Sequence, residues 1–197
     1  MSSSPFTIRA PPATDIWRKP PSKDIFNAPT STPSHLTPSS PLPLFLSTTL
    51  TFRLPYNHQY DQSGLLLTFS SPSSPSLKKW IKAGIEYYNS SPRLSVVSCD
   101  NWADWSVSAL TPDPDTSTPW TTISIQKEGN DNGVSLWVYQ VLSDGTKVPV
   151  REICWVYGLA DLESWTVKVE AMAARPAKGE LGELVAEVKE MDVKWKE

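Results

Sequence analysis

The sequence from residue 80 to residue 88 reads Trp80-Ile81-Lys82-Ala83-Gly84-Ile85-Glu86-Tyr87-Tyr88. Successive side chains of a β-strand point to opposite faces of the sheet, so this stretch sorts into two unlike sets. One set is apolar enough for a hydrophobic core: Ile81, Ala83, Ile85 and Tyr87. The other combines two aromatic rings, a cation, an anion and a glycine: Trp80, Lys82, Gly84, Glu86 and Tyr88. The stretch therefore predicts a strand with a core face and a binding face.

Alternation of apolar and polar residues continues along the chain from residue 42 onward. It predicts further short strands at 44–54, 62–69, 93–99, 104–110, 121–127, 134–142, 148–156 and 165–171. Turn residues separate them, and Asp144-Gly145 between two apolar runs is a strong hairpin signal. Many short strands at near-regular spacing are typical of an all-β sandwich or barrel.

The last segment of the chain fits two patterns. A helical stripe would contain Leu181, Leu184, Val185, Val188 and Met191, whereas a bulged strand would contain Val188, Met191, Val193 and Trp195. We favour the strand, because a sandwich with open edges needs a final partner strand.

The N-terminal segment, 1–41, differs in composition from the rest of the chain. Eleven of the 19 prolines lie between positions 1 and 55, which excludes long helices there. Apolar anchors such as Phe6, Trp17 and Phe26 favour an arm packed on a body over a disordered tail. We therefore divide the chain into an N-terminal arm (1–41) and a β-sandwich domain (42–197). The arm either crosses a groove and forms one wall, or straps a sheet edge.

The overall composition and charge limit which classes of protein this chain can belong to. The chain has 197 residues, a formal net charge of -3 and a pI near 5.5. Without a basic run, nucleic acid is a poor candidate partner, and no stretch approaches the roughly 18 apolar residues of a membrane span. No secretory signal is visible, so we expect a cytoplasmic protein. Cys99 and Cys154 are expected to be buried, unreactive thiols.

Four motifs occur in a fixed order: Tyr60–Leu65, Trp80–Glu86, Leu94–Val97 and Asp104–Ser106. Together they resemble the uncharacterised concanavalin A-like family (domain of unknown function 1349) that includes the fungal "regulation of enolase" type. The resemblance implies a jelly-roll β-sandwich with one convex and one concave sheet, and in related folds the concave sheet holds sugars. It implies no reaction. Glucanases of the wider fold carry two Glu and an Asp on one strand, whereas Glu86 is the one acid within 80–88, which counts against a conventional glycosidase.

The candidate ligand-binding residues lie mainly on the polar face of 80–88. Lys82 and Glu86 are separated by about 13 Å along a strand at roughly 3.3 Å per residue, so they cannot touch directly. They either hold opposite ends of one ligand or form structural ion pairs with neighbouring strands. Gln62 is a further hydrogen-bonding contact, and Asp61 before it either lines the groove or caps a turn. Aromatic rings that can stack on a flat ligand face are Trp80, Tyr88 and Trp105.

Two other residues complete the candidate set. His58 precedes the Asp61 motif and is a candidate general acid–base or ligand contact, with an ordinary loop histidine as the alternative. Asp104 shares a strand face with Ser106 and is expected to support Lys82. Neither His58 nor His35 has acid or cysteine neighbours at metal-ligand spacing, so we predict no metal site. No phosphate loop or nucleotide fingerprint is present, so we predict no cofactor.

The leading functional hypothesis is a module that binds a carbohydrate or another polyhydroxylated metabolite in the concave groove. The alternative is a metal-independent enzyme on small molecules, such as an isomerase, cyclase or hydrolase, with Glu86 as acid or base and Lys82 stabilising charge. A third hypothesis is a regulatory module that binds a protein partner. The fold does not decide among them, and the sequence leaves open whether any reaction is catalysed.

Overall fold

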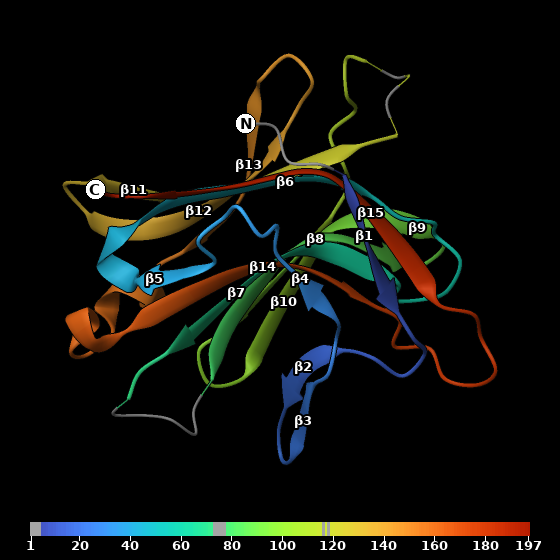
Figure 1. Ribbon diagram of the computed structural model, residues 1–197, viewed down its shortest axis with the longest axis horizontal. Helices are drawn as coiled ribbons and strands as arrows, with labels where there is room; N and C mark the ends of the chain where they lie inside the picture. The colour runs from blue at the N-terminus through green and yellow to red at the C-terminus, as the bar shows by residue number, and fades with distance from the viewer. Residues whose placement is uncertain (1–4, 73–77, 116, 118) are drawn as a thin grey trace.

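The structure is a computed structural model that describes residues 5–72, 78–115, 117 and 119–197, so residues 1–4 of the predicted arm lie outside it. Its regular secondary structure is almost entirely β-strand (Figure 1). The first strands are β1 (Phe6–Ala10), β2 (Ile16–Lys19), β3 (Lys23–Phe26), β4 (Thr30–Ser31), β5 (Ser39–Pro41), β6 (Phe45–Arg53), β7 (Gln62–Ser70) and β8 (Lys79–Tyr88). The remaining strands are β9 (Ser91–Cys99), β10 (Ala103–Ser108), β11 (Thr121–Asn130), β12 (Gly133–Val141), β13 (Lys147–Ile153), β14 (Thr166–Ala174) and β15 (Leu184–Trp195). The described residues also contain three 3₁₀ turns: η1 (Leu42–Leu44), η2 (Trp155–Gly158) and η3 (Leu162–Ser164).

Two antiparallel sheets face each other across the core (Figure 1). One sheet has the order β1-β15-β6-β11-β12-β13, and the other has the order β10-β9-β8-β7-β14-β4, with β5 also paired to β14. Each sheet also joins strands that are far apart in sequence, since β15 lies beside β6 and β14 beside β7. The fold is an all-β jelly-roll sandwich of the concanavalin A type, as predicted.

The alternation predicted for residues 80–88 is confirmed. Ile81, Ala83 and Ile85 lie in the core between the two sheets, each at most 2% exposed. The opposite sheet contributes Leu50, Phe52, Ile123 and Ile125 to the same core. The other set of β8 side chains consequently points outward, away from the six-stranded sheet.

The C-terminal segment is a strand, as predicted, and the helical alternative is wrong. Its pairing with β6 shifts register between Val188 and Glu190 and again between Lys194 and Trp195, as expected for a bulged strand. The strand does not close an edge, because it lies between β1 and β6.

The N-terminal residues contribute to both sheets. Strand β1 pairs with β15, and Ile8 and Ala10 enter the main core. Strands β4 and β5 pair with β14 of the other sheet. Between β1 and β4 in the sequence, β2 and β3 form a hairpin that lies on the outer face of the seven-stranded sheet (Figure 1). This β2–β3 hairpin determines the shape of that face.

The two cysteines differ in exposure. Cys99 is buried, and burial raises the pKa of its thiol to about 11. The prediction that Cys154 is buried is wrong, because β13 ends at Ile153 and Cys154 precedes the turn η2, outside the strand alternation. Within the described residues, no helix is long and apolar enough to span a membrane.

Candidate functional site

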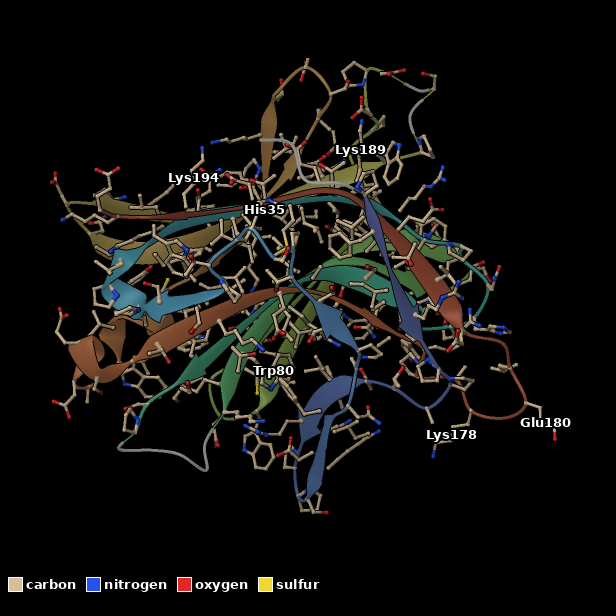
Figure 2. The ribbon with its side chains drawn as sticks, in the orientation of Figure 1. His35, Trp80, Lys178, Glu180, Lys189 and Lys194 are labelled. Carbon is tan, nitrogen blue, oxygen red and sulfur yellow. The ribbon has the colours of Figure 1, made fainter. Side chains whose placement is uncertain are left out.

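The β2–β3 hairpin covers one part of the outer face of the seven-stranded sheet. Ile16 of β2 is fully buried there in a second hydrophobic cluster, with Leu66, Trp80, Val97, Cys99, Met172 and Ala174. Trp80 has no exposed surface, and its indole N–H has no hydrogen-bond partner among the described residues. Figure 2 labels Trp80 on the side of the sheet where the hairpin lies. The expectation that Trp80 stacks on a ligand is therefore corrected: it is covered by the arm.

The hairpin has two unlike faces because its residues alternate. Ile16 and Arg18 face the sheet, where Arg18 donates to the backbone oxygen of Lys78 at 2.9 Å. Trp17, Lys19 and Lys23 lie on the opposite face, which borders an open cleft. The hairpin therefore forms a wall of the cleft, one of the two roles expected of the arm, while β1 and β4 pair along strands β15 and β14, close to the other role of a strap on a sheet edge.

The cleft between the hairpin and the sheet has a volume of about 480 Å³. Lys82, Glu86 and Trp105, which the sequence singled out, all line it. The rest of its lining consists of Asp15, Trp17, Lys19, Lys23, Tyr60 and Pro176. Strand β8 thus presents Lys82 and Glu86 to the same cleft from its outer face.

Lys82 lies at the floor of the cleft and is 5% exposed. Its Nζ donates to Gln62 Oε1 at 2.6 Å and lies 3.5 Å from Asp15 Oδ1. The amide nitrogen of Gln62 in turn donates to the backbone oxygen of Tyr60 at 3.2 Å. Gln62 is itself 5% exposed and is absent from the cleft lining, so it positions Lys82 rather than offering an open contact.

Glu86 is equally buried but has different partners. Its Oε2 accepts a hydrogen bond from Ser95 Oγ at 2.7 Å, and Ser95 Oγ accepts from Trp105 Nε1 at 3.0 Å. Burial raises the pKa of the Glu86 carboxyl, Lys82 and the hydrogen bond from Ser95 oppose that rise, and the charge of Asp15 adds to it. The net pKa is above the ordinary value, as expected for a desolvated carboxyl group in a cleft.

Two glycines let strands β7 and β8 approach closely at the position between Lys82 and Glu86. Gly64 of β7 lies directly opposite Gly84 of β8. A Cβ added to Gly84 would lie 2.0 Å from the backbone oxygen of Ser63 and 2.6 Å from the Cα of Gly64. The two strands can approach this closely because neither residue has a side chain.

An aromatic cluster forms one wall of the cleft. The ring centroid of Trp105 lies 5.1 Å from that of Tyr88 and 6.3 Å from those of Tyr60 and Trp17. Tyr88 also contacts Tyr60 at 5.8 Å but does not line the cleft. Tyr88 therefore supports the wall, and the rings open to a ligand are Trp17, Tyr60 and Trp105.

Asp104 does not support Lys82, which corrects the sequence-based expectation. It forms an ion pair with Arg151 of the other sheet, and Ser106 Oγ accepts from the same guanidinium at 3.2 Å. Asp104 neighbours Trp105 in strand β10, so the two side chains point to opposite faces. Since Trp105 faces the cleft, Asp104 cannot.

His58 also lies outside the cleft lining. It belongs to the turn before β7, where its backbone N–H donates to Asp61 Oδ2 at 3.1 Å. Asp61 is fully buried and accepts two hydrogen bonds from Arg175, at 2.9 and 2.7 Å. This pair joins the start of β7 to the end of β14. Asp61 thus caps the turn, one of the two roles expected of it, and among the described residues His58 has no acid–base partner.

Sequence reasoning missed the cleft residues that come from the arm and from the segment after β14. Asp15, Lys19 and Lys23 belong to the N-terminal arm, far from β8 in sequence, and Pro176 follows β14 near the other end of the chain. An aromatic residue in a Pro-rich segment, Trp17, was the one feature of the sequence that pointed to the cleft residues of the arm. The part of the chain that the structure describes contains no group of three or more His, Cys, Asp or Glu side chains that could hold a metal ion.

Comparisons with known proteins agree with this architecture. The model of a family described as "Protein of unknown function (DUF1349)" matches residues 1–194. An uncharacterized protein of Emericella nidulans is 37% identical over 176 residues, covering 89% of this chain and 80% of that protein. A functionally unknown protein from Saccharomyces cerevisiae is structurally similar, with a TM-score of 0.67, 18% identity, and coverage of 98% of this chain and 89% of that one. The GH43 protein BlXynB from Bacillus licheniformis is similar at a TM-score of 0.50 and 9% identity over 77% of this chain and 27% of that one, which concerns the fold alone.

Proposed function

Since the chain belongs to the DUF1349 family, whose description assigns no function, we propose one from the geometry of the cleft. We propose that the protein binds a carbohydrate or another small polyhydroxylated molecule between the β2–β3 hairpin and strand β8. The observation that carries the proposal is the pair of buried polar groups, Lys82 and Glu86, at the floor of a cleft walled by aromatic rings.

The dimensions and chemistry of the cleft support this proposal. Its volume of about 480 Å³ falls in the ordinary range for small-molecule sites, roughly 300–1,000 Å³. Such sites combine apolar walls with a few well-placed polar groups. Trp17 and Trp105 offer flat faces for the C–H surface of a sugar ring. A sugar hydroxyl group both accepts and donates hydrogen bonds. Lys82 can donate a hydrogen bond to such a group, and Glu86, when ionised, can accept one from it.

A second candidate function is a metal-independent enzyme that uses acid–base chemistry. The observation in its favour is that Asp15, contributed by the arm, adds a second carboxyl group to the cleft that already contains Glu86. The Asp15 charge also raises the pKa of Glu86, and two carboxyl groups in unlike environments suit an acid and a base. In this mechanism Glu86 is the proton donor, Asp15 the base, and Lys82 stabilises developing negative charge.

A thermal-shift screen of wild type and Glu86→Gln against sugars, polyols and sugar phosphates tests the proposal. A compound at 100 times its Kd adds about 2.7 kcal/mol to the folded state, which corresponds to a Tm rise of roughly 5–10 °C at this chain length. We expect at least one compound to raise the Tm of the wild type and to shift Glu86→Gln much less. The matched control is Glu180→Gln, which removes the same charge from an exposed loop away from the hairpin (Figure 2) and should respond like the wild type.

Nuclear magnetic resonance of the bound compound then separates binding from catalysis. A simple binding protein returns the compound unchanged. An enzyme converts it, and Glu86→Gln and Asp15→Asn then retain binding but lose turnover. If no compound shifts the Tm of folded wild type, the proposal is contradicted, and the remaining hypothesis is a protein partner.

A further inference from the structure

The cleft is positively charged in an acidic chain. Its lining contains three lysines and two carboxylates, a balance of +1, whereas the whole chain carries a formal charge of -3. A concave site whose charge opposes that of the whole molecule attracts ligands of the opposite sign.

Two of these lysines occupy an unfavourable arrangement. Lys19 and Lys23 are directly opposite each other in the β2–β3 hairpin, and like charges at such positions destabilise a strand pair. Neither ammonium group has an ion pair or side-chain hydrogen bond with a described residue. The adjacent pair of the same hairpin, Arg18 and Asp24, has opposite charges joined at 3.1 Å. The hairpin therefore concentrates unneutralised positive charge on the face that borders the cleft.

We propose that the ligand is a phosphorylated sugar or polyol, and that Lys19 and Lys23 hold its phosphate at the rim of the cleft. This inference rests on the proposed function, because it identifies the class of ligand for the same site. A phosphate monoester carries a charge of about -1.5 to -2 at pH 7, which matches two ammonium groups. Directly opposite residues have Cβ atoms about 4.5–5.5 Å apart, so two flexible lysine side chains can converge on one phosphate.

The partners of the remaining lysine fix the orientation of the ligand. Lys82 already contacts Gln62 Oε1 and Asp15 Oδ1, and two carboxylates share its part of the cleft. A phosphate placed there would meet the negative charge of Asp15 and Glu86. The phosphate therefore lies at the rim, and the hydroxyl groups extend inward past the rings of Trp17 and Trp105 toward Lys82 and Glu86.

Matched pairs of neutral and phosphorylated compounds test this inference. The probes are glucose and glucose 6-phosphate, fructose and fructose 6-phosphate, ribose and ribose 5-phosphate, with glucuronate and inorganic phosphate alone. Binding is measured by isothermal titration calorimetry at low and high salt. The variant is Lys19→Gln/Lys23→Gln. Its control, Lys189→Gln/Lys194→Gln, removes the same charge from exposed positions of β15, which Figure 2 shows on the far side of the molecule from the hairpin.

We expect one phosphorylated compound to bind the wild type at least tenfold more tightly than its neutral counterpart. The Lys19→Gln/Lys23→Gln variant should lose that tenfold advantage and keep its affinity for the neutral compound, while the control variant keeps both. Rising salt should weaken the phosphorylated compound selectively, because the lysines lie at the exposed rim.

Three results would overturn the inference. One is equal affinity for the neutral and phosphorylated members of every pair, with Glu86-dependent binding, which leaves the proposed function intact. Another is glucuronate binding as tightly as the best phosphorylated compound. The third is inorganic phosphate binding as tightly as any sugar phosphate and without dependence on Glu86, which indicates a simple anion site. Absence of binding by every probe contradicts the proposed function itself, so the two failures are distinguishable.

Discussion

Glu86 illustrates how a single residue connects burial with chemistry. Its carboxyl group is 5% exposed, and Ser95 donates a hydrogen bond to it. Its charged form is therefore less well solvated in the folded chain than in the unfolded chain. Burying this ionisable group in the cleft therefore lowers the stability of the folded chain when Glu86 is ionised. That loss of stability can be measured without knowledge of the ligand.

Glu86→Gln should stabilise the protein increasingly as the pH rises. Since folding raises the pKa of Glu86 above its ordinary value of 4.5, the folded chain binds more protons than the unfolded chain between the two pKa values. The contribution of Glu86 to stability is thus most favourable below pH about 4.5 and declines as the pH rises through the folded pKa. Urea denaturation of both proteins at pH about 4 and about 8 measures the change. If the free energies of unfolding of wild type and variant differ by the same amount at both pH values, the pKa of Glu86 is not raised. Glu180→Gln is the control for the loss of a surface carboxyl group.

The buried pair of Asp61 and Arg175 should matter for stability alone. The two side chains are 0% and 3% exposed, and removing one partner leaves a buried charge without its counterion. We expect Arg175→Met to lower the free energy of unfolding by about 3–5 kcal/mol. Asp61→Asn/Arg175→Met should cost less than the sum of the two single changes, because neither charge then remains unpaired.

The exposed pair of Arg9 and Glu183 provides the control for this experiment. Its side chains are 63% and 49% exposed and lie 3.5 Å apart, so Arg9→Met should change stability by less than about 1 kcal/mol. Urea denaturation measures all four variants. If Arg9→Met and Arg175→Met lower the free energy of unfolding equally, burial does not determine how much these ion pairs contribute to stability.

At the scale of single elements, sequence reasoning succeeded where a pattern is local. Strand β8 was predictable because its alternation depends on neighbouring residues, and the same holds for the Asp144-Gly145 hairpin. Asp104 was correctly placed on one strand face with Ser106, but its expected link to Lys82 was wrong, because alternation within a strand does not tell which distant side chain lies opposite. Trp80 was misjudged for another reason: its face was right, but Ile16 of the distant arm covers it.

Gly84→Ala should disrupt the pairing of β7 with β8. Replacing glycine by alanine in a strand usually gains about 0.5–1 kcal/mol, because the unfolded chain loses freedom. Here the new methyl group would lie 2.0 Å from the backbone oxygen of Ser63, so the strands must separate. We expect a loss of stability of about 1–3 kcal/mol, together with weaker binding of any cleft ligand. Gly158→Ala is the control, since its Cβ would meet nothing within 4 Å, and thermal denaturation compares the two. An unchanged Tm for Gly84→Ala would refute the close approach.

At the scale of the whole molecule, the N-terminal residues connect the two sheets. Strand β1 pairs with β15 in one sheet, β4 and β5 pair with β14 in the other, and the hairpin between them builds the cleft. Composition indicated an arm with apolar anchors but not which strands it would join, because pairing between distant segments leaves no local pattern. The division at residue 41 therefore stays a prediction that deletion can test.

Deleting residues 1–41 should damage both sheets and not only the cleft. The deletion removes Ile8 and Ala10 from the core, and it leaves edges of β15 and β14 without partners, which favours association between chains. We expect loss of cooperative unfolding and large assemblies in size-exclusion chromatography with light scattering. Replacing residues 17–25 by a short Gly-Ser linker is the matched control, because it keeps β1, β4 and β5. This variant should unfold cooperatively at a lower Tm and lose ligand binding, since the hairpin carries Trp17, Lys19 and Lys23. If the 1–41 deletion instead unfolds cooperatively and keeps the wild-type size, the arm is an appendage to an independent sandwich domain.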